Sequence, residues 1–331
     1  MLTKDQVYDE LIKKLPLKRN CNDYFPEYVK SALSDYLKIV EPIYKNDNRL
    51  LTVKEFILKL ESSIKYAFSG NLFESQNIFR EGMDCLLNGS GESRNSVLPI
   101  YGTDNFEDTY HYEKGSTSFL FRATQYEESM WHIPYEKRFL SSSSRFSVPG
   151  LPCLYLANSI KTCLIELGEI CVNKSYFVSC FEFDEFENGL LDLTMPRKIV
   201  GEPSEVYLDK SIFSWPLVAL CMIKKPNDAL YANANFVYEY LIPQYVISYL
   251  LSFSKIHAVK YFSTKCLNRK SWNIAIPVTE FKESGHSDKL KLMFKDHEKD
   301  TIGGYKVSKT REINYLDLFS LDEIESNMKR L

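Results

Sequence analysis

Residues 145–166 read RFSVPGLPCLYLANSIKTCLIE, and this stretch joins a short apolar strand to the beginning of an amphipathic helix. The run Cys153–Leu156 has the apolar, β-prone composition of a strand. Because successive side chains of a strand face opposite ways, Tyr155 points away from Leu154 and Leu156. One side of this strand therefore belongs to a core, and Tyr155 lines either a site or a second buried face.

A helix is predicted from Ser159 to Val172. At about 100° per residue, one face of this helix is apolar. That face consists of Ile160, Cys163, Leu164, Leu167, Ile170 and Cys171. Glu166 lies at its border, where a carboxylate can reach into a cleft while the helix stays anchored; an ordinary glutamate at the rim of a core has the same position.

Two arginines belong to this region: Arg122 lies upstream of residues 145–166, and Arg145 is the first residue of that stretch. Arg122 ends the apolar run Ser118–Phe121, and an arginine at a strand end is suited to bidentate contacts with phosphate or carboxylate. A surface ion pair is the structural alternative for it. Arg145 follows the four serines Ser141–Ser144, which predict a loop that either covers a pocket or is simply solvated.

The composition is that of an ordinary globular protein. The 331 residues are enough for two domains, or for one large domain with an extension. A net charge of −3 argues against a broad cationic surface for nucleic acid. The eight cysteines form no C-x-x-C pair and the five histidines show no zinc spacing, so no metal site is predicted.

The sequence also predicts where the protein acts. The N-terminal residues turn polar at once, without the apolar core of a signal peptide, and no run of about 18 apolar residues is present to span a bilayer. Cysteines without an export signal are typical of the reducing cytosol. We therefore expect a cytoplasmic protein that does not enter a membrane.

The pattern of the chain changes near residue 95. Before it the sequence reads as helical, with candidate capping boxes at Thr3–Gln6 and Thr52–Glu55 and an exposed loop at Asn88–Ser93. Beyond it, short β-prone runs alternate with helical patterns. We predict an α+β protein, with a helical N-terminal domain at 1–95 and a mixed-sheet domain at 96–331.

Several short pieces of the second domain occur together and in order. They are Phe121-Arg122-Ala123, Arg145-Phe146 with Gly150, Leu154-Tyr155-Leu156-Ala157-x-Ser159-x-x-Thr162-x-x-x-Glu166, Tyr240-x-x-Pro243-Gln244 and Tyr261-Phe262-Ser263. In this order and spacing they resemble the RES family, named for its arginine, glutamate and serine, whose members are bacterial toxins that act on NAD. The resemblance covers roughly residues 115–265, with Ser147 in place of an expected asparagine and no glycine before Ser263.

The resemblance implies a fold similar to ADP-ribosyltransferases, with a mixed sheet opened around an NAD cleft. It implies catalytic roles for Arg122, Glu166 and Ser263, and NAD binding by Arg122, Arg145, Tyr155 and Gln244. Arg122 would contact the phosphates or ribose with help from Arg145, and Tyr155 would stack near the nicotinamide. Glu166 would bind ribose hydroxyls and stabilise the sugar cation. Ser263 would position the ribose or the incoming group.

The chemistry of NAD suits these residue types. Breaking the nicotinamide–ribose bond releases a neutral base from a cationic ring, so the leaving group needs no proton. The enzyme has to stabilise positive charge on the sugar, which a preoriented carboxylate in a dry cleft does well. The same carboxylate can activate the nucleophile. NAD is thus expected as the substrate of an NAD glycohydrolase or NAD phosphorylase, in a toxin or antiphage defence effector that arrests growth.

The sequence also bears on other functions. An ADP-ribosyltransferase that modifies a protein or nucleic acid would use the same pocket, and the sequence does not separate the two. A HEPN-type nuclease is disfavoured, because none of the five histidines follows an arginine at the required spacing, and no phosphate-binding glycine motif occurs. A binding module without activity is disfavoured by the presence of Arg122, Glu166 and Ser263.

The extra N-terminal length predicts control of a toxic activity. The helices of residues 1–95 are expected to sense a trigger, to dock an antitoxin or regulatory protein, or to form a homo-oligomer.

Overall fold

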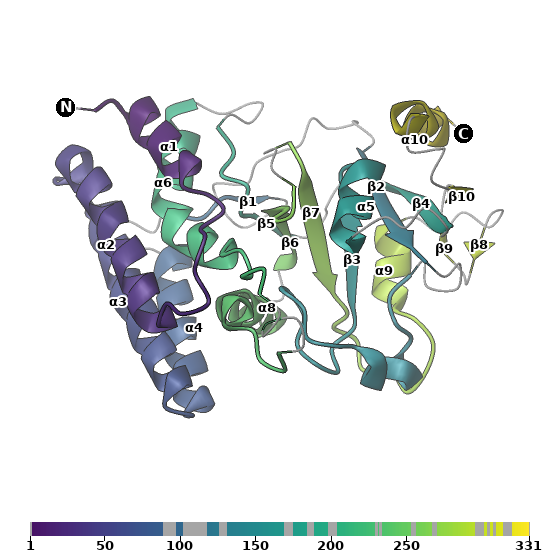
Figure 1. The fold of residues 1–331 in the computed structure, drawn as a ribbon, viewed down its shortest axis with the longest axis horizontal. Helices are drawn as coiled ribbons and strands as arrows, with labels where there is room; N and C mark the ends of the chain where they lie inside the picture. Colours follow the sequence, from purple (N-terminus) through teal and green to yellow (C-terminus); the bar gives the residue numbers. More distant parts are fainter. Residues whose placement is uncertain are drawn as a thin grey trace. The chain divides into compact units, whose positions relative to one another are not determined.

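The computed structural model describes most of the chain. The chain divides into two compact units (Figure 1). The described residues are 2–88, 97–101, 118–125, 131–168, 175–183, 189–197, 204–228, 231, 234–252, 256–266, 270–294, 301–302, 305–306, 309–313 and 320–330. The first unit comprises Met1–His111 and Leu191–Ser254, and the second comprises Tyr112–Leu190 and Lys255–Leu331. The loop expected at Asn88–Ser93 lies outside the described residues from position 89 onward.

The first unit is mainly helical. Its elements are α1 (Lys4–Lys13), α2 (Phe25–Tyr44), α3 (Asn48–Phe68), α4 (Leu72–Asn88), β1 (Ile100–Tyr101), α6 (Ser204–Cys221), η3 (Tyr238–Tyr240) and α8 (Leu241–Ser252). The helical character predicted for residues 1–95 is confirmed over the described residues 2–88. The unit also takes in residues 191–254, which the single boundary expected near residue 95 assigned to the other domain.

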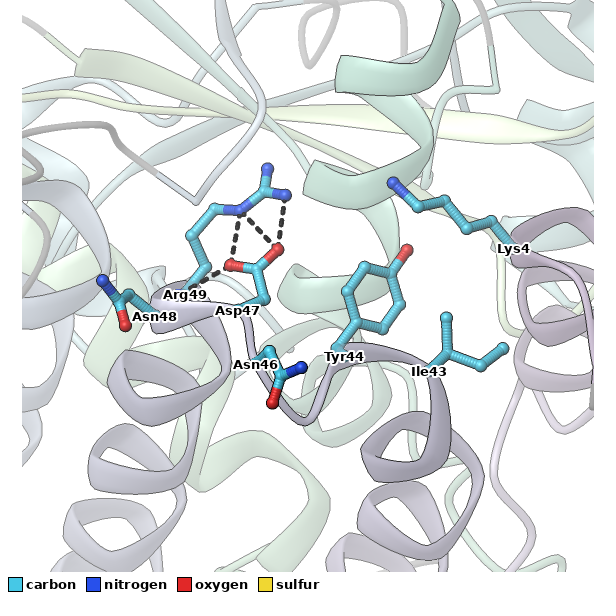
Figure 2. A pocket seen from close by; sticks show the side chains of 7 residues that line it. All are labelled: Lys4, Ile43, Tyr44, Asn46, Asp47, Asn48 and Arg49. Carbon is cyan, nitrogen blue, oxygen red and sulfur yellow. Dashed lines mark hydrogen bonds and ion pairs between the residues drawn. The ribbon is translucent and has the colours of Figure 1, made fainter.

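Helix α6 explains why this later segment belongs with the N-terminal helices. Almost all of its residues are buried, and it packs against α1, α2, α3 and α8. A helix that is buried on nearly every side requires neighbours around it. Its buried Asp209 accepts hydrogen bonds from Tyr44 at 2.5 Å, Arg49 at 2.8 Å and Lys4 at 2.9 Å. Figure 2 shows Lys4, Tyr44 and Arg49 around a cavity of about 530 Å³ beside this carboxylate.

The two predicted capping boxes have different outcomes. At Thr3 both hydrogen bonds form, from Gln6 N to Thr3 Oγ1 at 3.3 Å and from Thr3 N to Gln6 Oε1 at 2.8 Å. The box predicted at Thr52 is wrong, because Thr52 is buried inside α3. This helix begins four residues earlier, where the carboxylate of Asp47 accepts a hydrogen bond from the Arg49 amide at 2.9 Å.

The second unit is built on a sheet with the strand order β6-β7-β3-β2-β4-β10 (Figure 1). The bounds are Ile256–Phe262 for β6, Trp272–Pro277 for β7, Cys153–Ala157 for β3, Ser118–Thr124 for β2, Tyr176–Phe183 for β4 and Lys309–Ile313 for β10. Each of these neighbouring pairs is antiparallel. The α+β class predicted from the sequence is confirmed.

The remaining elements are short. They are η2 (Tyr135–Leu140), α5 (Ile160–Leu167), β5 (Gly189–Asp192), α9 (Asp288–Met293), β8 (Thr301–Ile302), β9 (Tyr305–Lys306) and α10 (Leu321–Arg330).

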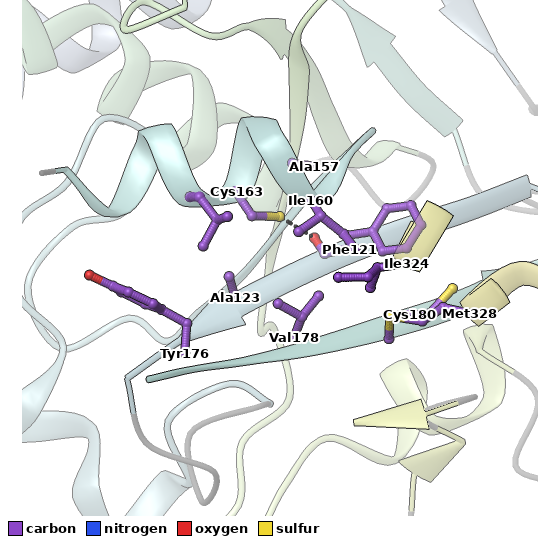
Figure 3. Packing of buried hydrophobic residues seen from close by; sticks show 11 residues of the cluster. Phe121, Ala123, Ala157, Ile160, Cys163, Tyr176, Val178, Cys180, Ile324 and Met328 are labelled. Atoms are coloured by element: carbon purple, nitrogen blue, oxygen red, sulfur yellow. Dashed lines mark hydrogen bonds between the residues drawn. The ribbon is translucent and has the colours of Figure 1, made fainter. Parts of the chain in front are cut away.

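Helix α5 lies on the sheet as its apolar face predicts, except that Leu167, which helical spacing places on this face, is 43% exposed. Ile160, Cys163 and Leu164 are buried against strands β2, β3 and β4 and against α10. Figure 3 shows this packing, in which Cys163 Sγ contacts the Phe121 carbonyl oxygen at 3.1 Å. The helix ends at Leu167, earlier than Val172, because Gly168 follows with a φ of +108°. Residues 169–174 lie outside the described residues.

Candidate active site

The centre of the candidate site is a hydrogen-bonded group of three side chains. Glu166 Oε1 accepts a hydrogen bond from Ser263 Oγ at 2.5 Å and another from Asn273 Nδ2 at 2.9 Å. Ser263 and Asn273 are buried, with 3% and 4% of their surface exposed, whereas Glu166 is half-buried. Two buried donors therefore hold the carboxylate of Glu166, a residue that keeps part of its surface exposed to solvent.

Helix α5 brings Glu166 to this position. Its first turn is fixed at two points, since Ser159 Oγ accepts from Thr162 N at 3.1 Å and Glu325 Oε2 accepts from Ile160 N at 3.1 Å. These bonds satisfy amides that the start of a helix leaves without partners. The first turn of α5 is thus capped and its apolar face packs on the sheet. Glu166 lies at the border of that apolar face, near the C-terminal end of the helix.

The strands β6 and β7 bring the two donors together. Asn273 lies in β7 opposite Tyr261 of β6 and opposite Ala157 of β3. Ser263 directly follows β6, and its amide donates to the Ser271 carbonyl at 3.0 Å. Residues directly opposite each other in an antiparallel pair share a face of the sheet. Asn273 thus reaches the same side of the sheet as Tyr261, on which Glu166 lies.

The hydroxyl of Ser263 has a defined direction. Its oxygen accepts hydrogen bonds from the amides of Lys265 at 3.3 Å and Cys266 at 3.1 Å. With two donors on the oxygen, the hydroxyl hydrogen is left for the Glu166 carboxylate. The ammonium of Lys265 donates to the main-chain oxygen of Glu166 at 2.6 Å and leaves the carboxylate to neutral donors.

Tyr155 lies on the same face of the sheet. It pairs with Ala275 in β7, two residues from Asn273, and alternation places both side chains on one side. Its hydroxyl contacts Ser144 Oγ at 2.6 Å, and burial raises the pKa of the Tyr155 phenol well above its ordinary value. Tyr155 therefore stays a neutral phenol. Beside it, the rings of Phe146 and Tyr261 lie with their centroids 4.5 Å apart.

The two predicted arginines approach this group from different sides. Arg122 Nη1 donates to the main-chain oxygen of Tyr155 at 3.2 Å, and burial lowers the pKa of its guanidinium. Arg145 Nη2 donates to Thr264 Oγ1 at 3.3 Å, next to Ser263 in the chain. Arg145 thus contacts the residue next to Ser263, and Arg122 contacts the main chain of β3.

The structure brings five of the six predicted residues into one unit. Arg122, Arg145, Tyr155, Glu166 and Ser263 all belong to the second unit, where direct hydrogen bonds join Glu166 to Ser263 and Arg122 to Tyr155. The sixth, Gln244, lies on α8 in the first unit, and its role in NAD binding stays a prediction from the resemblance.

Sequence reasoning missed four residues that complete these contacts, namely Ser144, Thr264, Lys265 and Asn273. The available signal for Asn273 was a buried-type strand, WNIAIP, that carries a single amide among apolar residues.

The described residues contain neither a metal-binding cluster nor a membrane-spanning helix. No group of three or more His, Cys, Asp or Glu side chains suited to a metal ion occurs among the residues that the structure describes. Within the same ranges, none of the helices is both long enough and apolar enough to cross a bilayer.

The chain is similar to one curated protein over most of its length. This is "Putative toxin YopC" of Bacillus subtilis (strain 168), 27% identical over 317 residues, which span 86% of this chain and 68% of that protein. A solved structure described as the M. tuberculosis MbcT-MbcA toxin-antitoxin complex contains a chain with a TM-score of 0.34 and 13% identity, covering 63% of this chain and 91% of that one. No protein-family model matches the sequence.

Proposed function

We propose that this protein is a toxin that breaks the nicotinamide–ribose bond of NAD and transfers the ADP-ribosyl group to water or phosphate. The observation that carries the proposal is the half-buried carboxylate of Glu166, anchored by two uncharged donors, Ser263 and Asn273. The toxin named among its relatives supports a toxic effector. The resemblance of the motifs around Arg122, Tyr155 and Glu166 to RES proteins supports NAD as the substrate.

The proposed reaction needs negative charge beside the sugar. As the C–N bond breaks, its electron pair leaves with nicotinamide, which departs as a neutral base. The ribose carbon is left with oxocarbenium character, and the Glu166 carboxylate stabilises it. A water or phosphate oxygen then bonds to this carbon and loses a proton, which the same carboxylate accepts and passes to solvent.

The other residues have matching proposed roles. The guanidinium groups of Arg122 and Arg145 are suited to the pyrophosphate of NAD, since arginine binds phosphate through paired N–H donors. Tyr155, held as a neutral phenol, offers an aromatic face to the nicotinamide ring. Ser263 holds the carboxylate and, in this proposal, positions the ribose or the incoming group.

The first prediction tests the carboxylate directly. Purified full-length protein is incubated with NAD, with and without phosphate, and nicotinamide, ADP-ribose and its 1″-phosphate are quantified. Glu166→Gln keeps the shape of the side chain but removes its charge, so we expect nicotinamide release to fall by about 100-fold or more. The exposed Glu283→Gln is the matched control and is expected to keep wild-type activity.

Each outcome of this assay has a defined meaning. Intact NAD after long incubation of the wild type in both buffers would overturn the proposal. ADP-ribose found on a protein or nucleic acid, with none released free, would instead assign an ADP-ribosyltransferase. Expression of wild type and Glu166→Gln in a bacterium, with NAD and growth measured, extends the test to toxicity.

A toxin that consumes NAD endangers the cell that makes it. We therefore propose a neutralising antitoxin or regulatory protein as its partner. Binding is measured by pulling down tagged Glu166→Gln protein together with the product of a neighbouring gene.

A further inference from the structure

We propose that Asn273 is a positioning residue, which holds the Glu166 carboxylate so that its second oxygen, Oε2, faces the reacting sugar. The inference rests on the proposed function and deepens it. The hydrogen bonds to Glu166 are distributed unevenly over its two carboxylate oxygens.

Both donors to the carboxylate converge on a single oxygen. Ser263 Oγ and Asn273 Nδ2 each donate to Oε1, at 2.5 and 2.9 Å. In the part of the chain that the structure describes, no hydrogen bond reaches Oε2 of Glu166. A carboxylate has about four acceptor positions on its two oxygens. Saturating one oxygen therefore sets the plane of the group and leaves the other oxygen to a ligand.

The two donors come from different segments, and this makes the anchor rigid. Ser263 follows β6, and Asn273 lies within β7. A single hydrogen bond would allow the carboxylate to rotate about its donor. Two donors on separate segments of the chain fix its rotation. A fixed carboxylate does not have to reorient when positive charge appears on the sugar.

The position of Asn273 is costly without this role. Its side chain is 4% exposed in a strand whose other residues are mostly apolar and buried. A buried amide without a partner costs stability, and an apolar residue would pack there without that cost. The hydrogen bond to Glu166 accounts for an asparagine at this place.

The chemical type of the donor also fits. An amide donates a hydrogen bond but carries no charge, so it orients Glu166 without neutralising it. The nearby ammonium of Lys265 is bonded instead to the main-chain oxygen of Glu166. A lysine or arginine on the carboxylate would weaken its attraction for a sugar cation.

The test compares three variants of the full-length protein in the nicotinamide-release assay. Asn273→Leu keeps the branched shape and the number of heavy atoms of asparagine but has no donor, and we expect kcat to fall roughly 10- to 100-fold while KM for NAD changes little. Val278→Ala, in a buried residue just beyond β7, is the control for destabilisation alone. It is expected to lower the melting temperature and to leave kcat unchanged.

Asn273→Asp provides a readout that a purely structural role would not move. At neutral pH its carboxylate repels Glu166, and activity is low. As the pH falls, the two carboxyls share one proton, which restores a hydrogen bond to Glu166. We expect activity relative to wild type to rise toward acidic pH, and no such rise for Asn273→Leu. Other titratable groups near position 273 are Lys265, Cys266, Tyr155 of β3 and Tyr261 of β6.

The outcomes separate the inference from the proposed function. An active wild type with unchanged kcat in Asn273→Leu overturns the positioning role alone, and so does an Asn273→Asp profile parallel to that of Asn273→Leu. A wild type that leaves NAD intact overturns the proposed function and this inference with it. A fall in kcat with acid recovery of Asn273→Asp supports the inference.

Discussion

At the scale of single residues, the environment of each polar group fixes its chemical state. Ser263 receives two amide hydrogen bonds on its oxygen and so turns its hydrogen toward Glu166. His132 is another case, because it is 2% exposed and lies between two backbone groups. Its Nε2 accepts from the Ser287 amide at 3.0 Å, which leaves Nδ1 to donate to the Ile133 carbonyl at 2.8 Å. This arrangement needs a neutral ring.

His132 makes the stability of the protein sensitive to acid. Burial lowers its pKa to about 4, so the folded protein takes up this proton later than the unfolded chain as the pH falls. A histidine with a depressed pKa destabilises the fold as the pH falls from about 6.5 to about 4. We expect this residue to remove up to about 3 kcal/mol of the free energy of unfolding over that range.

Urea unfolding at pH 7 and at pH 4.5 measures this effect. The variant His132→Gln keeps an acceptor for the Ser287 amide but does not titrate, and it should show a smaller loss of stability between the two pH values. An equal loss in both proteins would mean that carboxylates, and not His132, cause the acid sensitivity.

At the scale of elements, α5 connects the core to the candidate site. It ends at Leu167 and is followed by Gly168, which has φ +108° and ψ −149°. This conformation is accessible almost only to glycine. A Cβ at this position would meet no atom within 4 Å, so the penalty for alanine is one of backbone conformation and not of a clash.

We predict that Gly168→Ala lowers the free energy of unfolding by about 1–3 kcal/mol. Nicotinamide release is expected to fall as well, because the end of α5 would shift with Glu166 on it. Chemical denaturation measures the first effect and the NAD assay the second. Lys161→Ala, at an exposed position of the same helix, serves as the control. Unchanged stability in Gly168→Ala would contradict the prediction.

Local patterns explain which elements were predictable. The strand at 153–157 and the buried face of α5 follow from alternation and helical spacing over a few residues. The capping box predicted at Thr52 is wrong because Asp47 offers a competing cap, which begins the helix earlier. A motif of four residues does not decide between two such starts.

The candidate site was predictable only in part, because much of it depends on strand register. Resemblance to known motifs pointed to Glu166 and Ser263, but nothing near Asn273 in the sequence marks it as their neighbour. Asn273 reaches Glu166 because β7 pairs with β3 and β6 in one particular register. A shift of one residue would turn the amide to the other face of the sheet.

At the scale of the whole molecule, the first unit is assembled from two separate segments of the chain. Residues 191–254 return to the helices of residues 1–88, and α6 is buried by α1, α2 and α3. A fragment cut at the predicted boundary would retain α6 without three of its packing partners. Its large apolar surface would then be exposed to water.

We therefore predict that residues 96–331 expressed alone aggregate, and that residues 1–95 supplied as a second chain restore solubility. Size-exclusion chromatography with light scattering measures both, and the same measurement on the full-length chain shows whether it forms a homo-oligomer. A soluble, monodisperse fragment of residues 96–331 would refute the prediction.

The cap on α5 has a consequence for synthesis on the ribosome. The Ile160 amide donates a hydrogen bond to Glu325 of α10, which lies 165 residues later in the chain. Ile324 and Met328 of α10 complete the core beneath α5. A nascent chain that has not yet exposed α10 lacks this support for the helix that carries Glu166. Under the proposed function, translation products that stop before α10 are therefore expected to be inactive.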